Sequence, residues 1–374
     1  MRLLDRYLLR ELLIPLGYCL GGFLIFLDFA DLSASFGDFQ RRKLLAQDIA
    51  EYYLVKAPEF LVFVLPIALL LALLYTLTNH SRHHEITAIR AAGVSLGRLC
   101  VPYLAIGFVG SVLLFALNEL WVPQSSDRAE RILNRRMPAA PDAPLPDEVR
   151  NLTFVNSRDG RTWQIGVYRV KTGEMLNPHI IWNQADGSRL WYAAQTGARV
   201  DGVWTFYNVR VHREPALTNA MLIPVLQTNV LAMPQFTETP DQIRSEIKLA
   251  KSISGRRAKN PDIPISEILN YVRLHPDLPR GDQNWLYTKL HGRLAAPWAC
   301  LVVVLIAIPF GAASGRRNVY VGVASSILIC FVYYVVQQIG VAIGIAGLMP
   351  AWLAGWFPNL SFGLVGLWMT GRVR

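Results

Sequence analysis

Long stretches without a charged side chain constrain the fold of this chain more than any other feature. Such runs cover residues 12–27, 60–79, 99–118, 294–315 and 319–371. A helix that crosses about 30 Å of hydrocarbon needs about 20 apolar residues. The last run is too long for one crossing, and Gly347, Pro350 and Pro358 indicate where it turns back. We therefore predict six transmembrane helices.

The first run is the shortest and has a second interpretation. It follows Arg2, Arg6 and Arg10, as the apolar core of a secretory signal peptide would. However, Asp28 and Asp31 come directly after it, and no small-x-small cleavage site precedes them. The sequence therefore favours an uncleaved anchor, lengthened by snorkelling of Arg10.

The overall composition agrees with a membrane protein. The 374 residues are 52% hydrophobic and only 17% charged, and the mean hydropathy is +0.29. The net charge of +10 is scattered among apolar spans, so it favours anionic lipid over nucleic acid as a partner. All four cysteines lie in apolar runs, which predicts buried small side chains and no disulfide framework.

Charged and turn-forming residues replace the apolar runs between the third and fourth helices. Asp-Gly pairs at 159–160, 186–187 and 201–202 separate stretches with period-2 alternation, which is typical of antiparallel hairpins. We predict helices 1–3 within residues 1–123, a β domain over 124–240, a helical linker over 241–285 and helices 4–6 over 286–374. In the segment 204–212, the alternation predicts one face with Thr205, Tyr207, Val209 and Val211, and an opposite face with Trp204, Phe206, Asn208, Arg210 and His212.

Arginines in the short connections predict the orientation in the membrane. Those on one side, which should be cytoplasmic, are Arg2, Arg6, Arg10, Arg82, Arg90, Arg98, Arg316, Arg317, Arg372 and Arg374. The first-to-second connection, with Arg41, Arg42 and Lys43, is discordant, and the long β domain is exempt from the rule. Both termini are thus expected in the cytoplasm, and the β domain outside it.

A short segment rich in small residues, 85–95, lies on the predicted cytoplasmic side between the second and third helices. Within a helix at about 83–97, small residues would let another protein approach the backbone, namely Ala88, Ala91, Ala92 and Gly93. Glu85 and Arg90 offer polar groups of opposite charge. We interpret it as a docking element. The alternative is a solvated connector in which Gly93 to Ser95 restart the next helix.

Several catalytic motifs are missing. No Gly-x-x-x-x-Gly-Lys-Ser/Thr phosphate loop occurs, so any ATP-driven step by that route needs a partner. His80, His83 and His84 favour an interfacial group over a metal site. The string Gly93-Val94-Ser95-Leu96-Gly97 matches a nucleophile elbow, but no strand precedes it. The spans carry almost no ionisable groups, which disfavours an ion-coupled transporter, and Gln337 and Gln338 read as interhelical hydrogen-bonding groups before substrate contacts.

Several motifs together resemble the LptF/LptG permeases of the lipopolysaccharide exporter, over the whole chain and in order. They are Leu4-Asp5-Arg6-Tyr7, the segment 85–95, Asn118-Glu119-Leu120-Trp121-Val122-Pro123, Leu290-His291-Gly292-Arg293-Leu294-Ala295-Ala296-Pro297 and the segment 352–359. The resemblance implies a bacterial inner-membrane protein with a periplasmic jellyroll-like domain between helices 3 and 4.

The resemblance also implies partners. It implies a second LptF/LptG-type permease around a central lipid cavity, a cytoplasmic ABC ATPase dimer seated on the segment 85–95, and a periplasmic jellyroll protein of the LptC/LptA type that receives the lipopolysaccharide. No cofactor and no metal are implied. Glu85, Ala88, Ile89, Ala92 and Gly93 would then couple the permease to the ATPase.

The lipid-contacting residues are less strongly indicated. Candidates are Asp28, Gln337 and the basic trio Arg41, Arg42 and Lys43, which is placed where lipid phosphates would pass. The trio is equally a surface-exposed basic turn. The residues leave open a permease for another lipid or a lipoprotein, and a membrane-anchored assembly scaffold.

Overall fold

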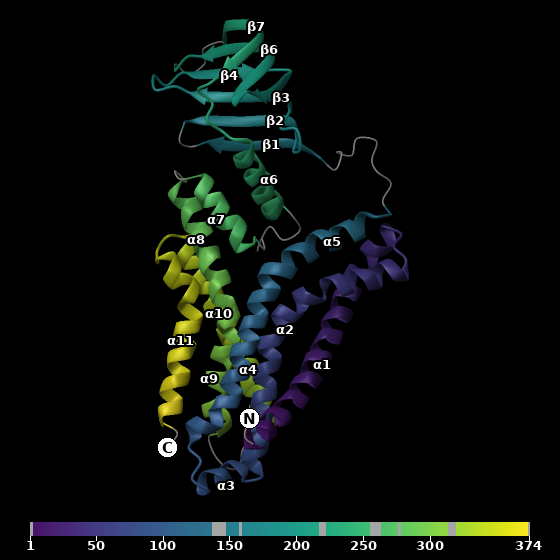
Figure 1. Ribbon diagram of the computed structural model, residues 1–374, viewed down its shortest axis with the longest axis vertical. Coiled ribbons are helices and arrows are strands. Elements are labelled where there is room, and N and C mark those ends of the chain that lie inside the picture. Colours follow the sequence, from purple (N-terminus) through teal and green to yellow (C-terminus); the bar gives the residue numbers. More distant parts are fainter. Residues whose placement is uncertain are drawn as a thin grey trace. The chain divides into compact units, whose positions relative to one another are not determined.

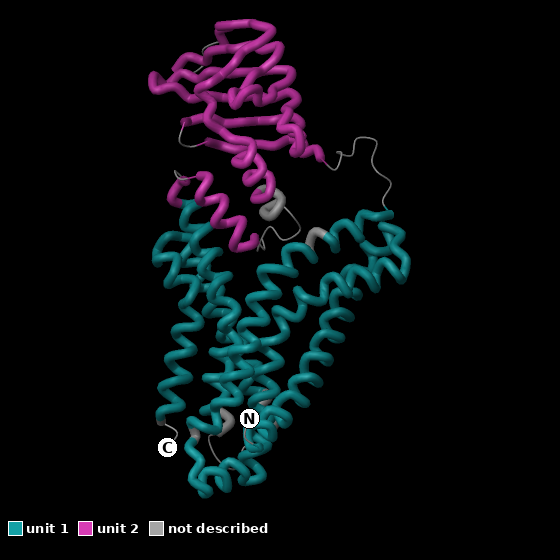
Figure 2. The backbone as a smooth tube through the Cα atoms, in the orientation of Figure 1, with its two compact units in different colours: residues 1–137, 281–374 teal, residues 138–280 magenta. Residues whose placement is uncertain are grey.

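The computed structural model describes residues 3–136, 147–156, 159–216, 222–254, 263–275, 278–312 and 319–372. It separates into two compact units, which Figure 2 colours differently. Unit 1 contains residues 1–137 and 281–374 and is helical. Unit 2 contains residues 138–280 and holds the β-sheet. Four of the arginines that predict the orientation lie outside the described residues: Arg2, Arg316, Arg317 and Arg374.

Unit 1 is a bundle of long helices joined by short turns (Figure 1). Its elements are α1 Leu3–Arg41, α2 Ala46–Arg82, α3 Glu85–Ala91, α4 Leu96–Ala116, the π-helix Leu117–Trp121, α5 Val122–Asn134, α8 Arg280–Ala295, the 3-10 turn Ala296–Trp298, α9 Ala299–Ala312, α10 Val319–Ile345 and α11 Ala351–Arg372. Helix α3 and both chain ends lie at one end of this unit, and the α1–α2 turn lies at the other.

Five helical stretches among the described residues are long and apolar enough to cross a membrane. They are Leu3–Arg41, Ala46–Arg82, Gly97–Asn134, Arg280–Pro309 and Ala324–Ile345. Helix α11, the sixth predicted crossing, has 22 residues and is not among the five. The fold is therefore mostly helical with apolar candidate spans and an antiparallel sheet.

The first helices extend far beyond the uncharged runs that predict them. Helix α1 has 39 residues and α2 has 37, which is roughly 58 and 55 Å of helix. Outside the apolar runs, the last turns of α1 and the first turns of α2 pack against α5. They form a separate core of Phe39, Tyr52, Ala129, Ile132 and Leu133. The change in composition near residue 124 thus marks an amphipathic helix, and the first strand begins only at Glu148.

Glycines allow the last helices to pack closely. A Cβ on Gly344 of α10 would lie 2.5 Å from the Cβ of Ala354 in α11 and 2.8 Å from Oγ1 of Thr288 in α8. A Cβ on Gly355 would lie 2.7 Å from the backbone N of Gly292. Without side chains at these positions, the backbones approach each other as small residues allow in membrane helices.

Unit 2 contains one seven-stranded antiparallel sheet followed by two helices. The strands are β1 Glu148–Asn156, β2 Arg161–Arg169, β3 Met175–Asn183, β4 Arg189–Ala193, β5 Thr196–Val200, β6 Val203–Glu214 and β7 Ile223–Met233, and the helices are α6 Pro240–Ser254 and α7 Ile265–Leu274. Strands β4 and β5 continue one another between β3 and β6 with unchanged register. The strands thus pair in chain order, and the antiparallel sheet fits the expected jellyroll-like domain.

The predicted faces of β6 are wrong beyond residue 207. Trp204 and Phe206 are buried, but so are Val209 and Val211, which strict alternation places on the opposite face. The reason is Asn208, whose φ of 52° is in the left-handed region and shifts the alternation by one residue. Asparagine tolerates this conformation better than most residues with a side chain.

A change in the alternation of side chains recurs across the sheet at one register position. We call this row the crease, and its residues are Asn151, Gly166, Asn177, Gln195, Asn208 and Asn229. Core-facing positions switch parity across it, as in β2, where Ile165 and Tyr168 are both buried. The amide of Asn208 donates to Oε1 of Gln195 at 2.7 Å along the row. The crease therefore lets both halves of the sheet enclose one core.

That core is aromatic and contains one buried charge pair. Trp163, Trp204, Phe206 and Phe236 pack together, and Ile243 and Ile247 of α6 join the same core. Nε of Arg161 donates to Oε1 of Glu238 at 2.9 Å, and both side chains are at most 3% exposed. Nε1 of Trp163 donates to the same carboxylate oxygen at 3.0 Å. Loss of either charge would leave the other buried without its counter-charge.

We predict that Gly344→Ala destabilises unit 1, because the added methyl group clashes with Ala354 and Thr288. Overpacking of this kind costs about 1–3 kcal/mol. The matched control is Gly363→Ala in α11, whose Cβ would meet nothing within 4 Å. Thermal unfolding in detergent should show a lower midpoint for Gly344→Ala and an unchanged or higher one for the control. Equal midpoints would contradict the packing argument.

Candidate functional site

The segment 85–95 forms a seven-residue helix with defined ends. Helix α3 starts at Glu85 after His84, whose φ is 56°. At its other end Gly93, with φ of 86°, donates its N–H to the carbonyl of Arg90, and Val94 donates to Ile89. This is the Schellman arrangement, which favours glycine at the left-handed position. Oγ of Ser95 then accepts from the N–H of Arg98 and caps α4.

One face of this short segment is covered and the other is open. Ile86 is buried in the core of unit 1, and Ile89 packs partly against the same core. Ala88, Ala92 and Gly93 are exposed. The exposed face of α3 therefore carries small side chains, and the opposite, apolar face packs against unit 1. A small-residue surface of this kind allows another protein to approach the backbone closely.

The carboxylate of Glu85 contacts both neighbouring long helices. The hydroxyl of Tyr7 in α1 donates to Oε2 at 2.9 Å, and Nδ1 of His80 in α2 lies 2.7 Å from the same oxygen. The rings of Tyr7 and His80 also meet, with centroids 5.7 Å apart. Glu85 thus connects α3 to α1 and α2 at once. We call Tyr7, His80 and Glu85 the clasp.

The surroundings of Glu85 affect its ionisation. Partial burial raises the pKa of the Glu85 carboxyl, but the hydrogen bonds from Tyr7 and His80 and the nearby His80 and His83 lower it by more. The pKa therefore lies below its usual value. A second contact lies beside the clasp, because Nη2 of Arg98 in α4 donates to both carboxylate oxygens of Asp5 in α1, at 3.0 and 2.8 Å.

Sequence reasoning missed the roles of Tyr7 and His80. Tyr7 belongs to the motif Leu4-Asp5-Arg6-Tyr7, and His80 belongs to the cluster with His83 and His84. Tyr7 is 78 residues and His80 five residues from Glu85 in the sequence, so no local pattern predicts that the three meet. Of the three histidines, His80 faces Glu85, and Nδ1 of His83 lies 2.9 Å from the carbonyl of Asn79. Within the described residues, no group of three or more metal-ligating side chains gathers.

The lipid-contact candidates are dispersed over unit 1. Arg41 and Lys43 are exposed, whereas Arg42 donates to Oδ1 of Asn134 at the end of α5. Asp28 is partly buried, and its Oδ1 has no hydrogen-bond partner within the described part of the chain. Gln337 lies in α10, and no hydrogen bond or ion pair among the described residues joins it to the other candidates. The described contacts therefore do not bring these five residues into one site.

A polar cluster near Asp28 was not predicted. Nζ of Lys56 in α2 lies 2.8 Å from Oδ1 of Asp31 in α1, and the hydroxyl of Tyr53 donates to the other carboxylate oxygen at 3.0 Å. The ammonium also lies 4.9 Å from the ring centroid of Phe60. Lys56 lies just before the uncharged run 60–79, so the uncharged runs give no signal for it.

A further cluster holds α5 to the start of α2. Both terminal nitrogens of Arg135 donate to Glu51, at 2.8 and 2.9 Å, and Arg136 pairs with the buried carboxylate of Asp48. Between α4 and α5, the π-helix leaves the carbonyl of Asn118 to accept from Nη2 of Arg293 at 2.7 Å. The helical stretch from α4 to α5 is therefore fixed at its middle and at its end.

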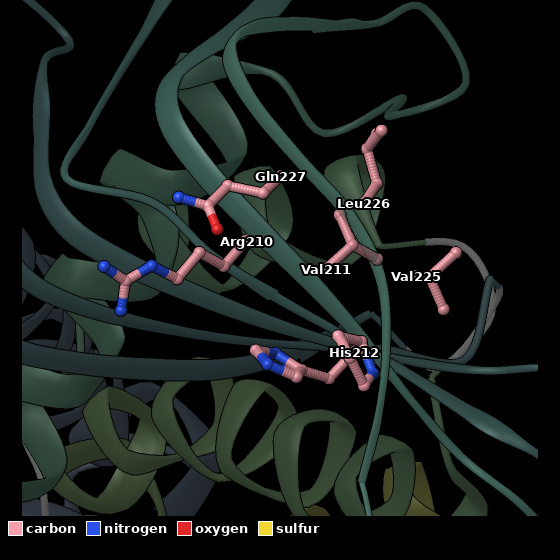
Figure 3. A pocket seen from close by; sticks show the side chains of 7 residues that line it. Arg210, Val211, His212, Val225, Leu226 and Gln227 are labelled. Carbon is pink, nitrogen blue, oxygen red and sulfur yellow. The ribbon is translucent and has the colours of Figure 1, made fainter.

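A pocket of about 200 Å³ lies on unit 2, between β6 and β7. Figure 3 shows its lining side chains, which combine polar Arg210, His212 and Gln227 with apolar Val211 and Leu226. It is located where the pairing of β6 and β7 shifts by one residue, between Val211 and His212. The lining includes no group arranged for catalysis.

These features are those of a membrane protein with several apolar candidate spans, an antiparallel sheet domain and a short exposed helix at one end of its helical unit. The sequence profile of the lipopolysaccharide export system permease LptF/LptG matches residues 6–372. The chain belongs to this family. No curated protein matches it by sequence.

Family membership confirms the resemblance drawn from the motifs. It implies a role as a membrane permease in lipopolysaccharide export, that is, a transporter subunit and not itself an enzyme. Together with the apolar helices, it supports a multi-pass protein of the inner membrane.

We predict that Tyr7→Phe loosens α3 while keeping the ring contact with His80. A partly exposed hydrogen bond to a charged group is worth about 1 kcal/mol. Amide hydrogen exchange in α3 should therefore become roughly fivefold faster. Tyr75→Phe, an exposed tyrosine of the same bundle, serves as the control. Unchanged exchange in Tyr7→Phe would show that the clasp does not hold α3.

The clasp should also depend on pH. Because the pKa of Glu85 is lowered in the folded chain, its contribution is present above the usual value of 4.5 and is lost as the pH falls through the lowered pKa. Exchange in α3, corrected for its intrinsic pH dependence, should accelerate in that acid range. Glu85→Gln should lack the step, and a step that persists in this variant must come from another group.

Proposed function

We propose that this chain is one of two permease subunits of an ABC transporter that extracts lipopolysaccharide from the outer leaflet of the inner membrane. It passes the lipid to a periplasmic bridge, and a separate cytoplasmic ATPase dimer supplies the energy. The observation that carries the proposal is α3, an exposed small-residue helix clasped to α1 and α2, in a chain of the LptF/LptG family.

The proposed topology has six crossings, formed by α1, α2, α4, α8–α9, α10 and α11. Both termini and α3 are cytoplasmic in this proposal, and unit 2 is periplasmic. The location of α3 and both chain ends at one end of unit 1 supports it. The arginines of the short connections support it as well.

In the proposed mechanism, α3 receives the motion of the ATPase. Ala88, Ala92 and Gly93 admit the partner surface, and Ile89 and Glu85 complete the contact. Movement of α3 is transmitted through the clasp to α1 and α2, and through the short turn at Ser95 to α4. The lipid cavity between the two permeases then narrows and expels its contents outward.

Basic side chains at the opposite end of unit 1 suit an anionic headgroup. Arg41 and Lys43 are exposed there, and we propose that they and Arg42 contact phosphates, with Asp28 and Gln337 nearer the cavity. Lys56 is an additional candidate, since a phosphate could compete with Asp31 for its ammonium.

Unit 2 would deliver the lipid to a periplasmic jellyroll protein of the LptC/LptA type. Strand β7 pairs with β6 on one side and carries exposed apolar side chains. An edge strand of this kind offers backbone groups for pairing with another sheet. This supports a docking edge at β7.

The decisive experiment is Ala88→Leu in the reconstituted complex of both permeases with the ATPase. A leucine on the open face blocks close approach, so ATPase co-purification and ATP-dependent lipid release should each fall at least tenfold. Ala46→Leu, at an exposed alanine in the α1–α2 turn region, is the matched control.

The outcomes separate the alternatives. Full coupling in Ala88→Leu and in Glu85→Arg would refute docking at α3. Mass spectrometry of the released lipid should detect lipopolysaccharide, and a phospholipid or lipoprotein would instead indicate another export substrate. A complex without ATPase and without lipid would favour a membrane-anchored scaffold.

A further inference from the structure

The crease of unit 2 follows a rule that depends on strand direction. The positive-φ residues are Asn151 in β1, Asn177 in β3 and Asn208 in β6, with φ of 53°, 49° and 52°. These three strands run in the same direction, because each is separated from the next by one antiparallel neighbour. In the described structure, Gly166, Gln195 and Asn229, on the strands of opposite direction, have no positive φ.

Among the described residues, β7 is the last strand of the sheet on one side, and it carries exposed apolar side chains. Leu226 lies opposite Val211, which is 4% exposed, yet Leu226 itself is 45% exposed. Val230 is exposed as well, but it lies opposite Tyr207 on the other face of the sheet. On the core-facing side, Met233 opposite Trp204 is buried, so the apolar layer of β7 is uncovered around Leu226. An uncovered position of this kind would be expected where another strand is to be added.

We infer that β7 accepts a strand that carries asparagine or glycine opposite Asn229. The occupant is an antiparallel strand of a partner protein, and it would run in the direction of β1, β3 and β6. By the alternation of the crease, its residue in register with Asn229 must take the left-handed conformation. The inference rests on the proposed function, in which β7 is the docking edge, and adds a sequence requirement on the partner.

The requirement has a simple physical cause. A strand that does not change its alternation at the crease would point its core-facing side chains outward on one side of it. In the strands that run in the direction of β1, β3 and β6, a left-handed residue makes this change. A β-branched residue could follow the interruption only in a conformation that is strained for it. Asparagine and glycine avoid most of this cost. Pro224 lacks an N–H, so the added strand would pair with the part of β7 after it.

The probe is a fluorescein-labelled synthetic peptide with the sequence of residues 203–213, which has the direction and interruption of β6. Its binding to the full-length chain in detergent is measured by fluorescence anisotropy. Peptides with Asn208 and with Asn208→Gly should bind within about threefold of each other. A peptide with Asn208→Val should bind at least tenfold more weakly.

Register is tested by disulfide trapping. With Val230→Cys in the chain, a peptide with Tyr207→Cys should cross-link, whereas one with Phe206→Cys should not, because it is one residue out of register. Val230→Pro should abolish binding. The matched control is Val155→Pro on β1, at the other edge, which should leave binding intact.

The outcomes distinguish the two proposals. Equal binding of the Asn208→Val peptide, or cross-linking out of register, overturns the crease requirement and leaves docking at β7 standing. Failure of every peptide to bind overturns the docking edge itself. Concentration-dependent dimers of the chain that Val230→Pro abolishes would show a second copy as the occupant and would also overturn the inference.

Discussion

Burial of α2 holds unit 1 together. In its apolar half, Leu69, Leu70, Leu73 and Leu74 are all at most 1% exposed, although the helix is long enough to cross a bilayer. Lipid offers no water for unpaired backbone groups, so helices are required. The apolar half of α2 is covered by neighbouring helices, as is most of α9. Helices α1, α9, α10 and α5 pack against α2. Near its end, His80 of α2 contacts Glu85, so the short exposed helix α3 is attached to a long helix that its neighbours cover.

The sequence predicts those features that depend on a short stretch of neighbouring residues. Uncharged runs predict the apolar helices, and Asp-Gly pairs predict the turns before β2, β4 and β6, with Gly160, Gly187 and Gly202 all at positive φ. The small-residue face of α3 was likewise readable, since Ala88 and Gly93 need no tertiary contact to be recognised. The four cysteines were predicted to be buried small side chains: Cys100 and Cys300 are buried, whereas Cys19 and Cys330 are only partly buried.

Features that depend on distant contacts could not be predicted in this way. The clasp joins Tyr7 to Glu85 across the rest of α1 and the whole of α2, and no local pattern indicates that pairing. The extension of α1 and α2 depends on burial of Phe39 and Tyr52 against α5, in a stretch whose composition resembles a soluble domain. The crease was missed because one left-handed asparagine reverses an alternation that is otherwise regular. Asparagines inside predicted strands were the available signal.

The crease makes the six strand levels of unit 2 depend on one another in sequence. Deletion of one residue on either side of Asn177 would move its interruption out of line with Gly166 and Gln195, and the neighbouring strands could not compensate separately. Insertions and deletions should therefore accumulate in the turns and not within the strands. In related chains, the number of residues between each hairpin turn and the crease should be more constant than the identity of those residues. The crease can therefore be used to align the sheets of distant relatives.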